Sequence, residues 1–217
     1  MTLVKYTEIK IKDSGEALVD LSDYDFVIDP KYYKQGLSND PNLYLRKGVA
    51  EKLESIQANM NGYKFKIWDA YRSRDVQENI YKKFRKQLKT ENPFWNDERL
   101  KLETGKFVSP PHEAGRIPPH VTGGAVDLTL VGKNGKELNM GTKFDHFGEE
   151  SKWDYFEKNS GNKQARDNRK RLRDLLIDEG FRKDLDEWWH FDFGNQIWAL
   201  DTKKDLAIYG ETTSRRK

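Results

Sequence analysis

Two short stretches, far apart in the chain, together carry enough imidazole and carboxylate groups to bind a metal ion. One stretch contains His120 and Asp127, and the other contains Glu187 and His190. If His120, Asp127 and His190 held one ion, a fourth position would remain for water. That pattern is typical of a catalytic zinc, whereas structural zinc sites are closed by four protein ligands. A fold that builds such a site must bring the two stretches together.

The spacing within the first stretch requires a reversal of the chain. Fully extended, the steps from His120 to Asp127 would span about 23 Å at roughly 3.3 Å per residue. Both side chains must nevertheless approach within about 2 Å of one ion. Gly123 and Gly124 lie between them, and glycine tolerates the positive φ of a tight turn. Asp127 would then project from the polar face of a strand, opposite Val126.

The spacing of Glu187 and His190 leaves two alternatives. Residues three apart share a face of a helix but point to opposite sides of a regular strand. The flanking Trp188, Trp189 and Phe191 favour a strand. Glu187 therefore lies either in the turn before the strand or at a bulge that redirects its side chain.

Two further residues, Glu187 and Arg72, have the chemistry that hydrolysis at such a metal would need. Zinc lowers the pKa of its bound water from about 9 for the aqueous ion to about 7. Glu187 beside that water could accept its proton and pass it to a leaving amine, and such help is worth about 10²–10⁴ in rate. Arg72, at the end of a predicted strand, could stabilise the oxyanion. Taken singly, each residue has an ordinary structural explanation, and His112 and His146 are predicted to have no role in the site.

Hydrophobic periodicity predicts an α+β fold. Helical spacing of apolar residues predicts helices over residues 45–60, 75–89 and 163–179. Alternation predicts strands over residues 63–68, 126–130 and 188–193, and residues 133–136 have the composition of a hairpin turn that leads to a partner strand. We expect a single domain over residues 1–217, with a small, mainly antiparallel sheet flanked by helices.

Residues 90–119 differ from the rest of the chain because prolines and glycines are concentrated there. They are Pro93, Gly105, Pro110, Pro111, Gly115, Pro118 and Pro119. This composition predicts a loop insertion without continuous regular structure. A long loop in a compact domain is usually functional, and this one leads directly to His120. We therefore expect it to form a wall or lid of the site.

Composition excludes several classes of protein. The 39 basic and 36 acidic residues give a net charge of only +3, so we expect no nucleic-acid partner, and the basic runs at 166–173 and 215–217 are predicted to be solvated. Without cysteine, neither a disulfide nor a thiolate zinc site is available. No segment has the length of a membrane span or the apolar core of a signal peptide, which predicts a cytoplasmic protein without a membrane partner.

Four motifs of this sequence occur in the same order as in a known family. They are Trp-Asp-Ala-Tyr-Arg at 68–72, His-x-x-Gly-x-Ala-x-Asp-Leu-Thr-Leu at 120–130, Met-Gly-Thr-x-Phe-Asp at 140–145 and Glu-Trp-Trp-His at 187–190. From about Asp29 to Phe193 the chain resembles the D-alanyl-D-alanine dipeptidases, cytoplasmic zinc enzymes. Their wider group includes D,D-carboxypeptidases and phage endolysin peptidases. The resemblance implies the zinc fold of the D,D-peptidase and hedgehog type.

The resemblance also implies roles for individual residues. One Zn²⁺ per chain would be held by His120, Asp127 and His190, with Glu187 as general base and acid and Arg72 steadying the tetrahedral intermediate. Asp145 would receive the free ammonium of the substrate, assisted by Tyr32 or, in a different alignment, Tyr33. The expected reaction is hydrolysis of D-alanyl-D-alanine or a similar short D,D-dipeptide.

Two departures from the family pattern keep other functions open. Pro118 stands where the family usually has serine, and Ser73 follows Arg72 as in the carboxypeptidase branch. One alternative is therefore a peptidoglycan D,D-carboxypeptidase or an endolysin-like peptidase. Another is a zinc-binding interaction module without catalysis, although such a module would need neither Glu187 nor Arg72.

Overall fold

The computed structural model describes residues 5–213, and its centre is a five-stranded sheet with the strand order β3-β5-β6-β8-β7. The strands are β3 (Val27–Ile28), β5 (Lys64–Asp69), β6 (Ala125–Val131), β8 (His190–Asp192) and β7 (Arg182–Lys183). β3 pairs with β5 in parallel, whereas all the other neighbours are antiparallel. The predicted α+β fold with a mainly antiparallel sheet is confirmed.

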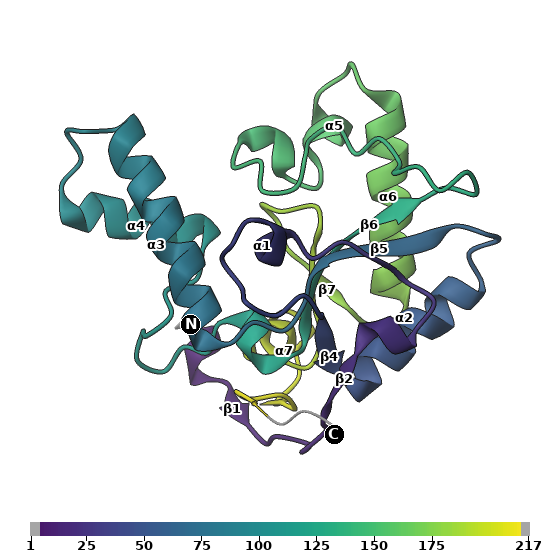
Figure 1. Cartoon of the computed structure of the whole chain (residues 1–217), viewed down its shortest axis with the longest axis horizontal. Helices are drawn as coiled ribbons and strands as arrows, with labels where there is room; N and C mark the ends of the chain where they lie inside the picture. Colours follow the sequence, from purple (N-terminus) through teal and green to yellow (C-terminus); the bar gives the residue numbers. More distant parts are fainter. Residues whose placement is uncertain (1–4, 214–217) are drawn as a thin grey trace.

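Two helices, α2 (Lys47–Ala58) and α6 (Lys163–Asp178), contribute to the core on one face of this sheet (Figure 1). Both helices were predicted from their apolar periodicity. Leu53 of α2 and Leu172 of α6 are fully buried in one cluster with Ile67 of β5 and Leu128 of β6. Ile67 and Leu128 lie directly opposite each other in the ladder, so their side chains share this face.

The other face of the sheet carries polar side chains in register across three strands. Asp69 of β5 lies opposite Asp127 of β6, and Asp127 lies opposite His190 of β8. A register shift between Ile67 and Asp69 sets this arrangement, because in a regular ladder Trp68 would lie opposite Asp127. All of β6 is buried, including Asp127 and Thr129 on the predicted polar face.

A helical hairpin projects to one side of the sheet, drawn in teal in Figure 1. It consists of α3 (Arg74–Glu91), which was predicted, and α4 (Asp97–Phe107), which was not. The expectation that residues 90–119 lack continuous regular structure is therefore wrong for this part. The prolines lie outside α4, and the Asn96 side chain caps it by accepting a hydrogen bond from the Arg99 N–H at 2.9 Å.

Shorter elements complete the chain. Two small sheets pair β1 (Lys10–Ile11) with β9 (Leu206–Ala207) and β2 (Leu18–Asp20) with β4 (Tyr44–Arg46). The short helices are α1 (Lys31–Lys34), α5 (Tyr155–Lys158) and α7 (Gln196–Asp201), and the 3₁₀ turns are η1 (Tyr6–Glu8), η2 (Leu21–Asp23), η3 (Pro119–Thr122) and η4 (Glu149–Ser151). None of these was predicted from periodicity, because each is too short to show one.

Three further predictions need correction. The turn at 133–136 forms, with Gly135 at φ 73°, but the expected partner strand is reduced to one bridge between Val131 and Glu137. The last predicted strand is shorter than residues 188–193, because Trp188 and Trp189 lie in the turn before β8. In the basic run of α6, Arg169 points inward and donates to the Met140 carbonyl at 2.7 Å. The run at 215–217 lies outside the described residues.

Across residues 5–213, every helix is too short or too polar to cross a lipid bilayer.

Candidate active site

His120 reaches the polar face of the sheet through the predicted reversal of the chain. It lies on η3, and Gly123 ends this turn at φ 71°, in the left-handed region. Gly124 is required for a different reason: an added Cβ would collide with the Phe193 carbonyl oxygen. The Gly-Gly pair therefore supplies both the turn and the close approach that brings β6 beside the chain after β8.

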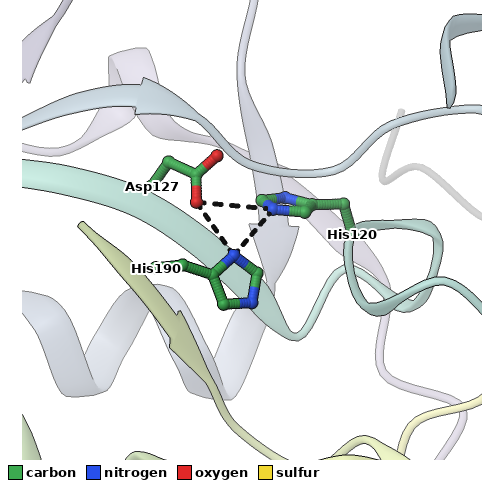
Figure 2. A group of neighbouring side chains, drawn as sticks. All are labelled: His120, Asp127 and His190. Atoms are coloured by element: carbon green, nitrogen blue, oxygen red, sulfur yellow. Dashed lines mark hydrogen bonds and ion pairs between the residues drawn. The ribbon is translucent and has the colours of Figure 1, made fainter. Parts of the chain in front are cut away.

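The three predicted donors meet on this face, as Figure 2 shows. His190 Nδ1 is 2.9 Å from Asp127 Oδ1 and 3.2 Å from His120 Nε2, and His120 Nε2 is 3.5 Å from Asp127 Oδ1. A tetrahedral ion about 2.0–2.1 Å from each donor would separate any two of them by about 3.3 Å. All three residues are buried. The donor atoms are therefore spaced as a small tetrahedral cation requires.

Each histidine is oriented by a second partner on its other nitrogen. His120 Nδ1 donates to the Ala70 carbonyl oxygen at 2.6 Å, which leaves the lone pair of Nε2 directed at the cluster. His190 Nε2 donates to Asp192 Oδ1 at 3.1 Å, which leaves Nδ1 for the cluster. Such outer partners fix the tautomer and the ring orientation of metal-binding histidines. Asp192 also raises the pKa of His190, although burial acts in the opposite direction.

Arg72 connects the donor cluster to the rest of the pocket. Its Nε donates to Asp69 Oδ2 at 2.6 Å and its Nη2 donates to Asp127 Oδ2 at 3.2 Å. Its Nη1 donates to Gln77 Oε1 at 3.1 Å, and the guanidinium lies 4.8 Å from the centre of the Tyr32 ring. The carboxylates around it raise the pKa of Arg72 against the effect of burial. Arg72 is thus a fixed positive charge beside the cluster.

Glu187 lies in the turn before β8, where the His190 N–H donates to its carbonyl oxygen at 3.2 Å. This resolves the two alternatives left by its spacing in favour of the turn. Its side chain lines the same cavity as the donor cluster without being one of the three donors. Burial raises the pKa of the Glu187 carboxyl well above its usual range. A carboxylate held this way is a strong proton acceptor.

Asp145 and Tyr32 form a second polar group in the cavity. The Tyr32 hydroxyl donates to Asp145 Oδ1 at 3.2 Å, whereas Tyr33 is 44% exposed, so only Tyr32 of the two candidates lies here. Burial and, second, the charge of Asp127 raise the pKa of Asp145 to about 7. Asp145 also has a positive φ of 59°, a conformation that aspartate tolerates better than most residues.

These groups line a cavity of about 310 Å³. Another part of its wall is built by the end of α4 and the segment that follows, through Phe107, Val108, Ser109, Arg116 and Ile117. The segment that leads to His120 therefore forms a wall of the cavity, one of the two arrangements expected from the sequence.

His112 and His146 lie outside the donor cluster, on exposed positions.

The model of the D-Ala-D-Ala dipeptidase family matches residues 26–207. The chain belongs to this family. A D-alanyl-D-alanine dipeptidase of Synechocystis sp. is 26% identical over 96% of the chain and 96% of its own length. A D-alanyl-D-alanine dipeptidase of Enterococcus faecalis is 32% identical over 75% of the chain and 78% of its own length. The chain is accordingly a peptidase, and the resemblance inferred from its motifs is confirmed.

One solved structure is also similar to this D-Ala-D-Ala dipeptidase family member. It is the vancomycin-resistance D,D-pentapeptidase VanY, as a variant in complex with Zn(II). The similarity has a TM-score of 0.47 and 15% identity, and it covers 92% of the chain and 96% of VanY.

Three residues of this family member were missed by the sequence reasoning. Asp69 contacts both Arg72 and His120, with its Oδ2 3.2 Å from His120 Nδ1. Asp192 is fully buried against His190, and Gln77 is buried against Arg72. A signal existed for Asp192, because a residue two positions after a ligand on a strand shares its face. No signal existed for Asp69, because its position depends on the bulge at Trp68.

Proposed function

We propose that this protein hydrolyses D-alanyl-D-alanine or a similar short D,D-dipeptide with one bound Zn²⁺ per chain. The observation that carries the proposal is one cavity that holds both the His120–Asp127–His190 cluster and the Asp145–Tyr32 pair. The first group suits a metal, and the second suits a free ammonium group. Family membership and the names of the two relatives support the same reaction.

The donor set favours zinc. Two imidazoles and one carboxylate, in a chain without cysteine, form a three-ligand set typical of catalytic zinc. When bound there, zinc would lower the pKa of a water and polarise the substrate carbonyl. The carbonyl of Ala70 and the carboxylate of Asp192 would hold the imidazoles in the orientation that the metal needs.

Two different residues of the protein transfer the proton and stabilise the developing negative charge. Glu187 accepts the proton of the attacking water and delivers it to the leaving amine, which its raised pKa favours. Arg72 stabilises the negative charge that develops on the carbonyl oxygen, because its guanidinium is held rigidly by Asp69 and Gln77. A preorganised cation of this kind needs no rearrangement during the reaction.

Asp145 and Tyr32 bind the ammonium group of the first residue. A buried carboxylate that pairs with an ammonium group disfavours longer peptides, whose amide nitrogen would leave that charge unpaired. An unsatisfied buried group costs about 1–3 kcal/mol or more for a charge. This feature distinguishes the proposal from the D,D-carboxypeptidase and endolysin alternatives, which act on longer chains.

The direct test is to incubate the purified protein with zinc and a panel of substrates. Release of D-alanine from D-alanyl-D-alanine is expected to exceed release from L,L and L,D dipeptides and from a pentapeptide ending in D-alanyl-D-alanine. Cleavage of the pentapeptide without cleavage of the dipeptide would favour a carboxypeptidase. Zinc binding without any hydrolysis would favour the interaction module.

Asp145 should lower the stability of the metal-free protein at alkaline pH. Its folded pKa of about 7 lies above the usual value of 3.8, so the folded state holds the proton more tightly and stability is lost as pH rises through this interval. Asp145→Asn should therefore raise the free energy of unfolding at pH 8, by on the order of a few kcal/mol, but not at pH 3. Urea unfolding at both pH values measures this.

The same substitution is expected to lower kcat/KM for the dipeptide at least about tenfold, because it removes the partner of the ammonium group. Asp178→Asn, on the exposed end of α6, is the matched control and should change neither quantity. An Asp145→Asn protein with equal gains at both pH values would contradict the assigned cause.

Asp192 should set the zinc affinity through His190. Asp192→Asn removes the negative charge that holds His190 Nε2–H, and loss of such an outer partner typically lowers metal affinity about 10–100-fold. Competition with a chromophoric chelator measures the dissociation constant. Asp184→Asn is the control, because Asp184 shares the partner Arg182 at 2.8 Å without being one of the carboxylates on His190. Equal zinc affinities for Asp192→Asn and wild type would remove this role.

A further inference from the structure

The cavity wall formed by the segment before His120 carries a cation, Arg116, for which the proposed reaction has so far no use. A dipeptide is a zwitterion, and Asp145 accounts only for its positive end. Its carboxylate also enters the cavity and needs a positively charged partner. We propose that Arg116 binds the carboxylate of the substrate's second residue, an inference that rests on the proposed function.

Each of the other cations that line the cavity is also paired with at least one carboxylate. Arg72 is bound to Asp69 and Asp127. Arg182 lies between three carboxylates, those of Asp184, Asp192 and Asp201, at 2.7–2.9 Å. A substrate carboxylate at Arg182 would be repelled by these neighbours, and Arg72 is already assigned to the oxyanion. Lys106 is paired with Glu103 at 2.6 Å, and its side chain is 54% exposed, so it faces water as well as the cavity.

Arg116 differs because the carboxylate that its Nη1 contacts, that of Glu113, is about half exposed. Its Nη1 donates to Glu113 Oε2 at 3.1 Å, and the Glu113 side chain is 47% exposed. An ion pair of this kind contributes little, about 0–1 kcal/mol, and exchanges easily. The Arg116 side chain is only 22% exposed, so a ligand carboxylate would meet a charge that is partly shielded from water. Arginine can bind a carboxylate through two parallel hydrogen bonds.

A chain of hydrogen bonds fixes Arg116 relative to the reaction centre. Arg72 Nη1 donates to Gln77 Oε1 at 3.1 Å, and Gln77 Nε2 donates to the Ser109 carbonyl at 2.8 Å. The Ser109 hydroxyl then accepts from Arg116 Nη2 at 3.0 Å. Gln77 is 1% exposed, so this connection is rigid. Arg116 is thus linked to Arg72 through Ser109 and Gln77, and each arginine would serve one negative charge in the reaction.

The two residues directly before His120 offer no donor of their own. Residues 117–119 are Ile117, Pro118 and Pro119, and the prolines offer neither a side-chain donor nor an N–H. Pro118 and Pro119 therefore cannot bind a carboxylate through their own backbone. Arg116 is the nearest preceding residue with a charged donor, and it lines the cavity.

The test compares D-alanyl-D-alanine with its C-terminal amide, which lacks the negative charge. Wild type is expected to prefer the acid by at least about tenfold in kcat/KM. Arg116→Gln should lower kcat/KM for the acid about 10–100-fold, mainly through KM, and should leave the amide within about threefold of wild type. Arg116→Lys should restore part of the preference. Lys106→Gln, another cation on the cavity wall, should keep the wild-type ratio.

The possible results separate a failure of the Arg116 assignment from a failure of the proposed function. If wild type hydrolyses the acid but Arg116→Gln keeps its preference for it, the role of Arg116 is refuted while the proposed function stands. Equal losses on both substrates would also refute it, because they would indicate a structural effect, which thermal unfolding of the variant would reveal. If wild type hydrolyses neither substrate, the proposed function itself fails.

Discussion

Replacing Glu187 by glutamine is expected to lower kcat about 10²–10⁴-fold while zinc binding is retained. The amide keeps the size of the side chain but cannot accept the proton of the attacking water. Zinc should remain because Glu187 lies in the turn before β8 and is not one of the three donors. Metal analysis after dialysis and steady-state rates with D-alanyl-D-alanine measure the two quantities.

A neighbouring carboxylate provides the control for this prediction. Asp186 precedes Glu187 in the chain and lines the same cavity, so Asp186→Asn makes the same change of charge one residue away. Its rate is expected to stay within a few-fold of wild type. A Glu187→Gln protein of nearly wild-type rate, or one that loses its zinc, would end the assignment of Glu187 as the base.

Replacing His120 by alanine is expected to remove both zinc and activity. His120 Nε2 is one of the three donors, and only two would remain. The loss of affinity should exceed the roughly 10–100-fold that removal of an outer partner causes. No D-alanine release should be detectable at zinc concentrations that saturate wild type. Zinc titration of the purified variant and of wild type measures the change.

The His120→Ala protein should nevertheless fold. The apolar core lies on the opposite face of the sheet, where Phe65, Ile67 and Leu128 pack against α2 and α6, and it does not depend on the metal. Zinc binds only the folded wild type in this arrangement, so it should raise the thermal midpoint of wild type but not that of the variant. His146→Ala, on an exposed position, is the control. A control that lost zinc, or a His120→Ala protein that kept it, would contradict the site.

The two faces of the central sheet are the reason why we expect the metal-site substitution His120→Ala to abolish activity without unfolding the protein. One face is apolar and closes the core, whereas the other holds Asp69, Asp127, His190 and Asp192 with little solvent around them. Burying several carboxylates on one surface is unfavourable unless cations neutralise them. Arg72 and Arg182 do this within the protein, and a divalent ion between the donors would do it further.

The sequence was sufficient for features that depend on local spacing. Apolar periodicity located α2, α3, α6, β5 and the central part of β6, because those segments are long enough to show which face is buried. The glycine pair between His120 and Asp127 predicted the turn that brings them together. The motifs also predicted that His120, Asp127 and His190 would meet, and their donor atoms lie within one cluster.

Other features depended on contacts between distant segments. The bulge at Trp68 decides that Asp69 faces the donor cluster, since a regular ladder would place a tryptophan there. Helix α4 was not predicted, because residues 90–119 were interpreted as one loop on the basis of their prolines and glycines. Hydrogen bonds through Gln77 and Ser109, two residues far apart in the sequence, link Arg116 to Arg72.

By itself, then, the sequence determined the identity of the donors, the main helices and strands, and the family. Only the tertiary structure decided which second partners orient those donors and which cations line the cavity. The physical reason is that periodicity and motif spacing report on one segment at a time. Strand register, bulges and hydrogen bonds between segments are fixed only when the segments pack against one another.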